Sequence, residues 1–325
     1  MESNNRLFTS PDLEVAINRQ PLIVPPNMSL RSVISLMGQA QEVSCSIEEN
    51  NLESEFSLSR KNYSGCALVM QDSALQGILT ERDIVKLTAK KLAFNTVKVG
   101  EVMTQPVVTL QQQNFQDIFA ALFLFRRYRI RHLPIVDRAE RLIGVVCPET
   151  IRRAMQPANL LKLRRVADVM SKNVIHAPLN TKVLKIAQLM TQHRVSCIVI
   201  TQKDPTENIL IPVGIVTERD ILQFQLLQIK LDNLEAQRVM STPLFLLSPE
   251  DSLLMANQEM QRRKVRRLVV SWNWGQGLGI VTQTSMLRIF DPIEMYGVIE
   301  TLQSTVQHLE QKNAELLALI KFPKN

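Results

Sequence analysis

Apolar and polar positions alternate along the chain in blocks that return in a fixed order. A short β-branched stretch such as 107–109 precedes an amphipathic segment, an apolar run, a turn, a second apolar run containing glycine, and another amphipathic segment. In the block near 183, apolar residues fall at Val183, Ile186, Ala187 and Met190, which is the spacing of one helix face. The apolar runs are short and unbroken, as in strands covered on both faces. The pattern predicts a β-α-β-β-α unit of the α/β class.

Two landmarks indicate that this unit occurs four times. A Val-Met-Ser/Thr element carries Met103, Met170 and Met240, which are 67 and 70 positions apart. A Gly-apolar-apolar element begins at 77, 144, 214 and 279, with steps of 67, 70 and 65. Because the two landmarks share one period, the chain is predicted to consist of repeats. The predicted segments are a tail at 1–12, repeats at 13–95, 96–158, 159–232 and 233–291, and a helix at 292–325.

The first repeat is longer than the others. Residues 43–63 are inserted between its first helix and its second strand, and they are rich in Ser, Asn and Glu with few apolar residues. This composition predicts a mobile surface loop. A tolerated insertion is favoured over a regulatory contact.

The composition argues against a membrane protein, a secreted protein and a metal-binding protein. The chain is 45% hydrophobic but only 5% aromatic, so a sizeable core is expected to be mainly aliphatic. The polar N-terminus lacks a signal-peptide core, and the apolar run at 118–125 is far shorter than the ~20 residues of a membrane helix. The four cysteines form no C-x-x-C pair and the four histidines are scattered, so no metal site is expected. These features predict a cytoplasmic protein without a membrane span.

The net charge of +7 suits an anionic partner. Much of the arginine lies in two stretches, FRRYRIRHLPIVDRAERLIG and LKLRRV. The sequence shows no helix-turn-helix, no zinc-finger spacing and no long basic tail, so nucleic acid is a weak candidate.

Two of the four glycine-containing strands end in Thr-Glu-Arg-Asp, at 80–83 and 217–220. Thr80 and Thr217 each follow a predicted strand and precede a helix, where threonine caps the helix and an acidic residue completes a capping box. The same geometry suits a nucleoside ligand, because a helix N-terminus attracts phosphate and Asp83 or Asp220 accepts hydrogen bonds from ribose hydroxyls.

The other two repeats help to separate capping from ligand binding. Repeat two has Cys147 and Thr150 at the corresponding positions, and repeat four has Thr282 and Ser285. If capping were the only role, the Thr-x-x-Asp version would not fall on alternate repeats. The alternation favours one ribose site in each pair of repeats and leaves capping alone as the alternative.

The Val-Met-Ser/Thr element, the RHLPIVD strand at 131–137 and the GIVTERDI ending at 214–221 together resemble the CBS domain, the cystathionine β-synthase repeat. The resemblance covers about residues 13–291. It implies four repeats paired into two Bateman modules, as in the gamma subunit of AMP-activated protein kinase, which folds as a flat disk. It also implies an adenosine nucleotide, AMP, ADP or ATP with or without Mg²⁺, in clefts between paired repeats. A cyclic dinucleotide or S-adenosylmethionine would fit the same residues.

The family's site residues can be carried over by position. Asp83 and Asp220 would hold ribose, with Thr80 and Thr217 beside them. The strand starts that would frame base and ribose are Ile23, Gly65 and Cys66 in repeat one, and Ile175, His176, Ser196 and Cys197 in repeat three. The basic residues that would meet phosphate are Arg129, Arg131, His132, Arg194, Arg266 and Arg267. For each arginine, a solvated surface residue is the alternative.

The spacing of apolar residues changes after Pro292. Apolar residues recur in steps of four and three from Met295 to Ile320, with Asn313 at one core position. β-Branched residues at a and Leu at d favour two parallel helices, and one Asn at a fixes their register. The segment 293–321 therefore predicts a homodimeric coiled coil, with a single helix packed on the repeats as the alternative. In bacterial signalling proteins such a stalk leads to a kinase, cyclase or PAS output domain.

These observations predict a sensor that binds an adenosine-type nucleotide and transmits its state through the coiled coil to an output domain or partner. A ligand-free dimerisation scaffold is the alternative. The sequence contains no nucleophile–base pair, P-loop or metal cluster, so the chain itself is not expected to be an enzyme. A catalytic output domain could follow it in a longer protein.

Overall fold

A computed structural model of the chain describes residues 13–46, 65–113, 118–155, 161–162, 164–205, 209–273, 276–290 and 312. The described strands form four separate three-stranded sheets, one in each repeat. In each sheet the first and second strands are parallel and the second and third are antiparallel. The predicted fold of four β-α-β-β-α repeats is confirmed.

The helices and strands follow the same order in every repeat. Repeat one contains the 3₁₀ helix η1 (Leu13–Ala16), β1 (Leu22–Val24), α1 (Leu30–Ser46), β2 (Cys66–Gln71), β3 (Ala74–Thr80) and α2 (Glu81–Ala89). Repeat two contains α3 (Val99–Val102), β4 (Leu110–Gln111), α4 (Ile118–Tyr128), β5 (Leu133–Val136), β6 (Leu142–Val146) and α5 (Pro148–Met155). Repeat three contains α7 (Val166–Val169), β7 (His176–Pro178), α8 (Val183–His193), β8 (Cys197–Lys203), β9 (Leu210–Thr217) and α9 (Glu218–Leu226). Repeat four contains η3 (Ala236–Arg238), β10 (Leu246–Leu247), α10 (Leu253–Arg262), β11 (Arg267–Trp272), β12 (Gly277–Thr282), α11 (Gln283–Met286) and η5 (Leu287–Phe290).

The local predictions agree with these elements, with small differences. All four apolar residues expected on one face of α8 are buried. The first strand of repeat two lies at Leu110–Gln111 rather than at 107–109, because Leu110 is the residue that pairs with Ile135 of β5. Helix α1 continues to Ser46, into the segment predicted to be an inserted loop. The rest of 43–63 and, apart from position 312, the coiled-coil segment 293–321 lie outside the described residues.

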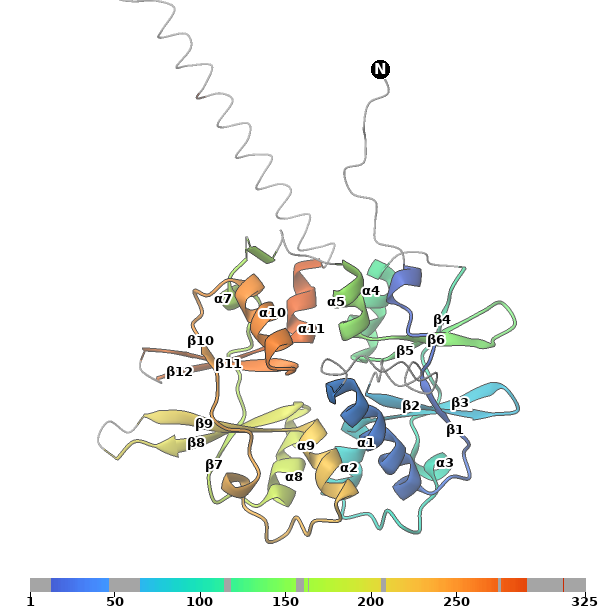
Figure 1. The fold of residues 1–325 in the computed structure, drawn as a ribbon, viewed down its shortest axis with the longest axis horizontal. Helices are drawn as coiled ribbons and strands as arrows, with labels where there is room; N and C mark the ends of the chain where they lie inside the picture. The colour runs from blue at the N-terminus through green and yellow to red at the C-terminus, as the bar shows by residue number, and fades with distance from the viewer. Residues whose placement is uncertain are drawn as a thin grey trace, which may run out of the picture.

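The sheets of repeats one and two face each other, as do those of repeats three and four (Figure 1). Apolar side chains fill both contacts. The buried residues are Cys66, Leu68, Ile78 and Val145 in the first pair, and Cys197, Val199, Ile215 and Val269 in the second. The two pairs correspond to the two predicted modules.

The two sequence landmarks contact each other inside each pair. Thr104, next to Met103, forms an antiparallel bridge with Ile78 in β3 of the partner repeat. A Cβ at Gly77 would lie 2.3 Å from the Sδ of Met103, so glycine leaves the space that the methionine fills. The same contact recurs between Gly214 and Met240 and, running from repeat three to repeat four, between Gly279 and Met170.

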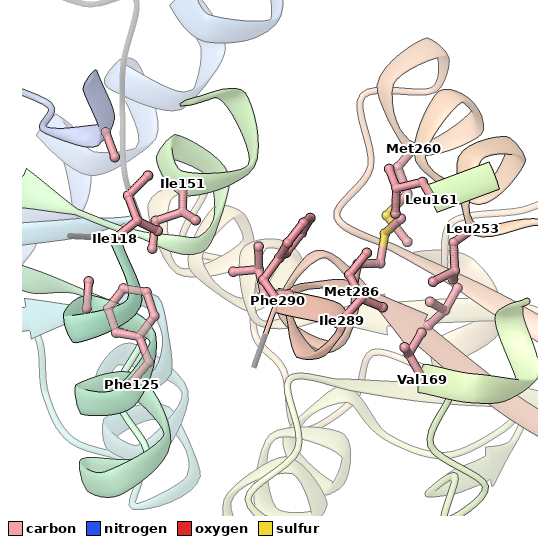
Figure 2. Packing of buried hydrophobic residues seen from close by; sticks show 14 of the residues in the cluster. Ile118, Phe125, Ile151, Leu161, Val169, Leu253, Met260, Met286, Ile289 and Phe290 are labelled. Atoms are coloured by element: carbon pink, nitrogen blue, oxygen red, sulfur yellow. The ribbon is translucent and has the colours of Figure 1, made fainter. Parts of the chain in front are cut away.

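The two pairs join through their helices. Helix α2 of repeat one packs on α8 and α9 of repeat three, where Val85 and Leu222 each enter the other repeat's core. Repeats two and four share another core, in which Phe290 lies between Ile151 of α5 and Met286 of α11 (Figure 2). The four repeats therefore occupy the corners of one assembly and meet at its centre (Figure 1). None of the described helices combines the length and apolarity of a membrane span.

Candidate ligand-binding site

The four repeats meet around a central cavity of about 350 Å³. Every repeat contributes to its walls, from the start of α2, the end of α4, the start of β8 and the start of β11. The charged residues of the described lining are Arg82, Arg129, Arg131, Arg194, Arg266 and Arg267, with Glu81 and Glu149. Six guanidinium groups and two carboxylates give the described lining an excess of positive charge, which favours anions.

The second strands of all four repeats start close to this centre, but with different residues. Repeats one and three place small residues there, Gly65-Cys66 and Ser196-Cys197. Repeats two and four place basic ones, Arg131-His132 and Arg266-Arg267. The small residues leave space for the long side chains that arrive from the other repeats.

Gly65 shows how tight this space is. Its φ of +86° lies in the left-handed region, which favours glycine. A Cβ there would lie 3.3 Å from both Nη1 of Arg266 and Nε2 of His132. A larger residue would be strained and would displace the basic side chains.

Glu218, the first residue of α9, is 1% exposed and binds two of the lining arginines. It accepts a hydrogen bond from Arg131 and another, at 3.1 Å, from Nε of Arg82. Burial alone would raise the pKa of Glu218, but the charges of Arg131, Arg82 and Arg267 outweigh it and hold that pKa at about 2. The ionised carboxylate therefore fixes both arginines at neutral pH.

Glu81, the first residue of α2, occupies the mirror position. Its side chain is 6% exposed and lies 3.2 Å from Nη1 of Arg266 and 3.9 Å from Nε of Arg219. Each glutamate thus pairs with one arginine from the diagonally opposite repeat and one from the other Thr-Glu-Arg-Asp motif. These reciprocal ion pairs connect the two modules, in addition to their shared apolar cores.

This role of Glu81, Arg82, Glu218 and Arg219 was missed in the sequence. Only the Thr and Asp of the Thr-Glu-Arg-Asp motif were predicted to have a role, and the Glu and Arg between them were not. A usable signal was present, because Glu-Arg occurs in repeats one and three and is replaced by Pro-Glu at 148–149 and Gln-Thr at 283–284.

The Thr-x-x-Asp residues form helix caps, as the capping interpretation predicts. The backbone N–H of Thr80 donates to Oδ2 of Asp83 at 3.1 Å, and the N–H of Asp83 donates to Oγ1 of Thr80 at 3.3 Å. Thr217 and Asp220 form the same box at α9.

The other repeats show that aspartate is not required for this cap. Ser285 closes the same box with Thr282. In repeat two the N–H of Cys147 donates to Oγ1 of Thr150 at 3.0 Å. Capping therefore does not explain why aspartate occurs in repeats one and three.

The two aspartates differ in their surroundings. Oδ1 of Asp83 accepts a hydrogen bond from Nζ of Lys86 at 2.8 Å, whereas repeat three has Gln223 at the position of Lys86. Burial raises the pKa of Asp220, and its hydrogen bonds with Thr217 oppose that shift. Neither aspartate lies in the described lining of the central cavity.

The cavity gathers nine of the seventeen predicted site residues. Those in its lining are Ile175, Ser196, Cys197, Arg129, Arg131, His132, Arg194, Arg266 and Arg267. Those outside the described lining are Ile23, Gly65, Cys66, Thr80, Asp83, His176, Thr217 and Asp220, of which Ile23 and His176 are exposed to solvent. Thr282 of repeat four lines the cavity together with the strand starts of repeat three, whereas Thr217, which pairs with Cys197 in the sheet, lies outside the described lining.

Two thiols also line the cavity. Burial raises the pKa of Cys147 and of Cys197. A thiol nucleophile needs the opposite shift, so the cavity does not activate either cysteine.

Comparison with known proteins places this geometry in a family. The CBS domain profile matches residues 13–90, 99–157, 166–226 and 236–291. MJ1225 of Methanocaldococcus jannaschii is 25% identical over 175 residues, which are 50% of this chain and 59% of that protein. A 33.4 kDa protein from the ribosomal RNA operon of Thermofilum pendens is 29% identical over 167 residues, or 48% of this chain and 52% of that one. The matched segments thus span little more than half of these two relatives.

A solved structure of a relative shows the same fold. The crystal structure of MJ1225, described as a proposed archaeal homologue of g-AMPK, matches 86% of this chain and 99% of its own with a TM-score of 0.69 and 20% identity. PAE2072 of Pyrobaculum aerophilum, a CBS domain protein solved with AMP, is 24% identical over 38% of this chain and 89% of its own, with a TM-score of 0.34. The profile match extends over most of the sequence, and the chain belongs to the CBS domain family.

Proposed function

We propose that this chain is a regulatory module that binds an adenine nucleotide in its central cavity. The cavity is the observation that carries the proposal. Its volume of about 350 Å³ lies within the range of small-molecule sites. Val174, Ile175 and Ile280 give it apolar walls for a purine, and its six arginines suit phosphates, with or without Mg²⁺.

The bound state would be transmitted through the interface between the two modules. The cavity arginines come from both modules, so a ligand that binds them alters how firmly the modules hold each other. Phe290 lies in that interface and directly precedes the segment predicted to form the dimeric coiled coil (Figure 2). A change in packing would reach this stalk and then a kinase, cyclase or PAS output domain or another partner. A ligand shifts such an equilibrium only by its differential affinity for the two states.

Arg129 and Arg194 allow the charge of the cavity to be changed with little effect on the fold. Each follows the first helix of its repeat with a positive φ, 53° and 55° respectively, which glycine adopts readily. Lys264 occupies the same place in repeat four, with a φ of 53°, and lies outside the described lining. The residue after each of them donates the same backbone hydrogen bond to the preceding helix.

Replacing both Arg129 and Arg194 by glycine is expected to weaken ATP binding about 30-fold. Each change removes one contact to phosphate, worth about 1 kcal/mol at a solvent-exposed position. Isothermal titration with AMP, ADP and ATP, with and without Mg²⁺, measures the effect. Lys264→Gly makes the same backbone change and is expected to bind like the wild type. An equal loss in Lys264→Gly, or no heat with any nucleotide, would contradict the proposal.

A ligand-free dimerisation scaffold is the second candidate. The capping boxes favour it, because they give Thr80, Asp83, Thr217 and Asp220 a structural role without a ligand. In that case the wild-type chain binds none of the three nucleotides, and substitutions in the cavity change stability only.

Repeat four supplies a matched replacement for the two aspartates. In the double variant Asp83→Ser and Asp220→Ser, serine closes the cap as Ser285 does and only the carboxylates are lost. Because both aspartates lie outside the described lining, the affinity for ATP is expected to stay within about threefold of the wild type. Titration of the double variant checks this. A loss of more than about tenfold would instead assign the nucleotide to clefts in which these aspartates hold ribose, as the family resemblance implies.

A further inference from the structure

The contact between repeats one and three is apolar where their helices meet. Val85 of α2 and Leu222 of α9 are buried, and each enters the core of the other repeat. Nε of Arg82 donates to Glu218 at 3.1 Å across the same contact, and this glutamate is 1% exposed. Packed apolar side chains and a buried ion pair therefore close this side of the molecule.

The contact between repeats two and four has a polar residue at the matching position. Arg152 of α5 is the eighth residue after the glycine of its repeat. The other repeats have apolar residues there that are at most 5% exposed, Val85, Leu222 and Leu287. Nη1 of Arg152 donates to Oδ1 of Asn257 in α10 at 3.3 Å, and its buried Nε meets no acceptor among the described residues. An unsatisfied buried donor is costly, so Arg152 stabilises this contact less than an apolar residue would.

Asn257, which faces Arg152, departs from the other repeats in the same way. It is 8% exposed and lies seven residues before the positive-φ residue that follows its helix. Repeats two and three have Leu122 and Ala187 at that position. Replacing a buried ionic or polar contact by apolar residues is often neutral or stabilising. The pair of Arg152 and Asn257 therefore makes the contact between repeats two and four easier to open.

The end of repeat four supplies apolar closure on this side. Met286, Leu287, Ile289 and Phe290 belong to the core that repeats two and four share. Phe290 is 3% exposed and lies between Ile151 of α5 and Met286 of α11 (Figure 2). It also directly precedes the segment predicted to form the coiled coil. Closure between repeats two and four thus depends on the position of the chain that leads into that segment.

We propose that the two modules part between repeats two and four, with the contact between repeats one and three as the hinge. Parting takes Phe290 away from Ile151, so it moves the start of the predicted coiled-coil segment. Because linkage is reciprocal, a partner that holds this segment away from α5 would favour the open form. Opening is a property of the chain without ligand and does not depend on the proposed function.

Cysteine labelling at two matched positions tests the proposal in the full chain without ligand. Leu287→Cys places a thiol in the contact between repeats two and four, and Leu222→Cys places one at the same position in the contact between repeats one and three. A buried thiol reacts with iodoacetamide only when its contact opens, so the labelling rate of each peptide, read by mass spectrometry, measures opening. Leu287→Cys is expected to react at least about tenfold faster than Leu222→Cys. Equal rates would overturn the proposal.

Two further changes should shift the opening in opposite directions. Arg152→Leu with Asn257→Ala gives the pair the residues that repeat three has at these positions, and it is expected to slow labelling at 287 at least about fivefold. Phe290→Ala is expected to speed labelling at 287 at least about tenfold. Neither change should alter labelling at 222 by more than about threefold.

The same variants separate parting of the modules from fraying of residues 287–290 alone. If the apolar pair leaves labelling at 287 unchanged, fraying explains the reactivity and the proposal fails. An equal rise at 222 and 287 in Phe290→Ala would mean that the molecule has no hinge between repeats one and three. The apolar pair decides the question even if Phe290→Ala does not fold.

Discussion

Replacing Glu218 by alanine is expected to lower the free energy of unfolding by about 3–5 kcal/mol at pH 7. The side chain is 1% exposed and binds Arg131 and Arg82, so its loss leaves two guanidinium groups side by side without a counter-ion. Burial, and next to it the charge of Arg131, lower the pKa of Arg82, as expected for a guanidinium group that is partly desolvated and close to another one. Urea denaturation of the full chain measures the change.

An exposed ion pair provides the control. Glu250 pairs with Arg165 at the surface, where both side chains are about two-thirds exposed, so Glu250→Ala should change stability little. The double variant Glu218→Ala and Arg131→Ala should recover part of the loss, because it removes one of the two unpaired charges. If Glu218→Ala is no more destabilising than Glu250→Ala, the central ion pairs do not hold the modules together.

The carboxylate of Glu218 also makes the free energy of unfolding depend on pH. The folded pKa of Glu218, about 2, lies below its usual value of 4.5, so its contribution is present above pH 4.5 and is lost as the pH falls toward 2. The difference corresponds to about 3 kcal/mol, as an order of magnitude. Unfolding curves of wild type and Glu218→Gln between pH 5 and 2 should converge as the pH falls. Parallel curves would contradict this assignment.

Replacing Gly144 by alanine is expected to destabilise the chain by about 2–4 kcal/mol. The new Cβ would lie 2.4 Å from the carbonyl oxygen of Asn18 and 2.6 Å from Cγ2 of Ile17. Asn18 cannot move aside easily, because it exchanges two backbone hydrogen bonds of 2.9 Å with Val145. Thermal and urea unfolding of the full chain measure the effect.

Gly279 is the matched control for Gly144, because it occupies the same position in repeat four. There the nearest atom to an added Cβ is Sδ of Met170, at 3.0 Å, at the end of a flexible side chain. Gly279→Ala should therefore cost less than about 1 kcal/mol. If both variants lose the same free energy of unfolding, the backbone at Asn18 moves aside as easily as the side chain of Met170, and the assignment is contradicted.

The repeats and their elements could be predicted because their signals are local. The spacing from Val183 to Met190 is enough to indicate a helix, and each unbroken apolar run is enough to indicate a strand. The elements that contain Met103 and Gly77 were identified because they recur with the same spacing. Nothing in the sequence showed that these two residues contact each other. Their contact depends on how two repeats pair, which is a property of the tertiary structure.

The candidate site was predicted only in part, because its residues carry local signals but the contacts between them depend on the tertiary structure. Ile175, Ser196 and the basic residues were identified from their positions in the repeat, and the structure gathers them in one cavity. Their positions in the repeat did not show that the same cavity is also lined by residues of repeat four such as Thr282. The ion pair between Glu218 and Arg131 could not be predicted from the sequence. A local sequence pattern carries no information on a contact between residues of different modules.

The ion pair between Glu81 and Arg266 joins residues that are 185 positions apart. At a synthesis rate of about 5–20 residues per second, Arg266 is made about 10–40 s after Glu81. During that interval Glu81 has no Arg266 to pair with, and its carboxylate must stay hydrated. The surface of the first module around Glu81, which later faces the central cavity, is therefore charged and hydrated while the chain is still on the ribosome. This charge should discourage the half-made chain from packing against another copy until its own second module has emerged.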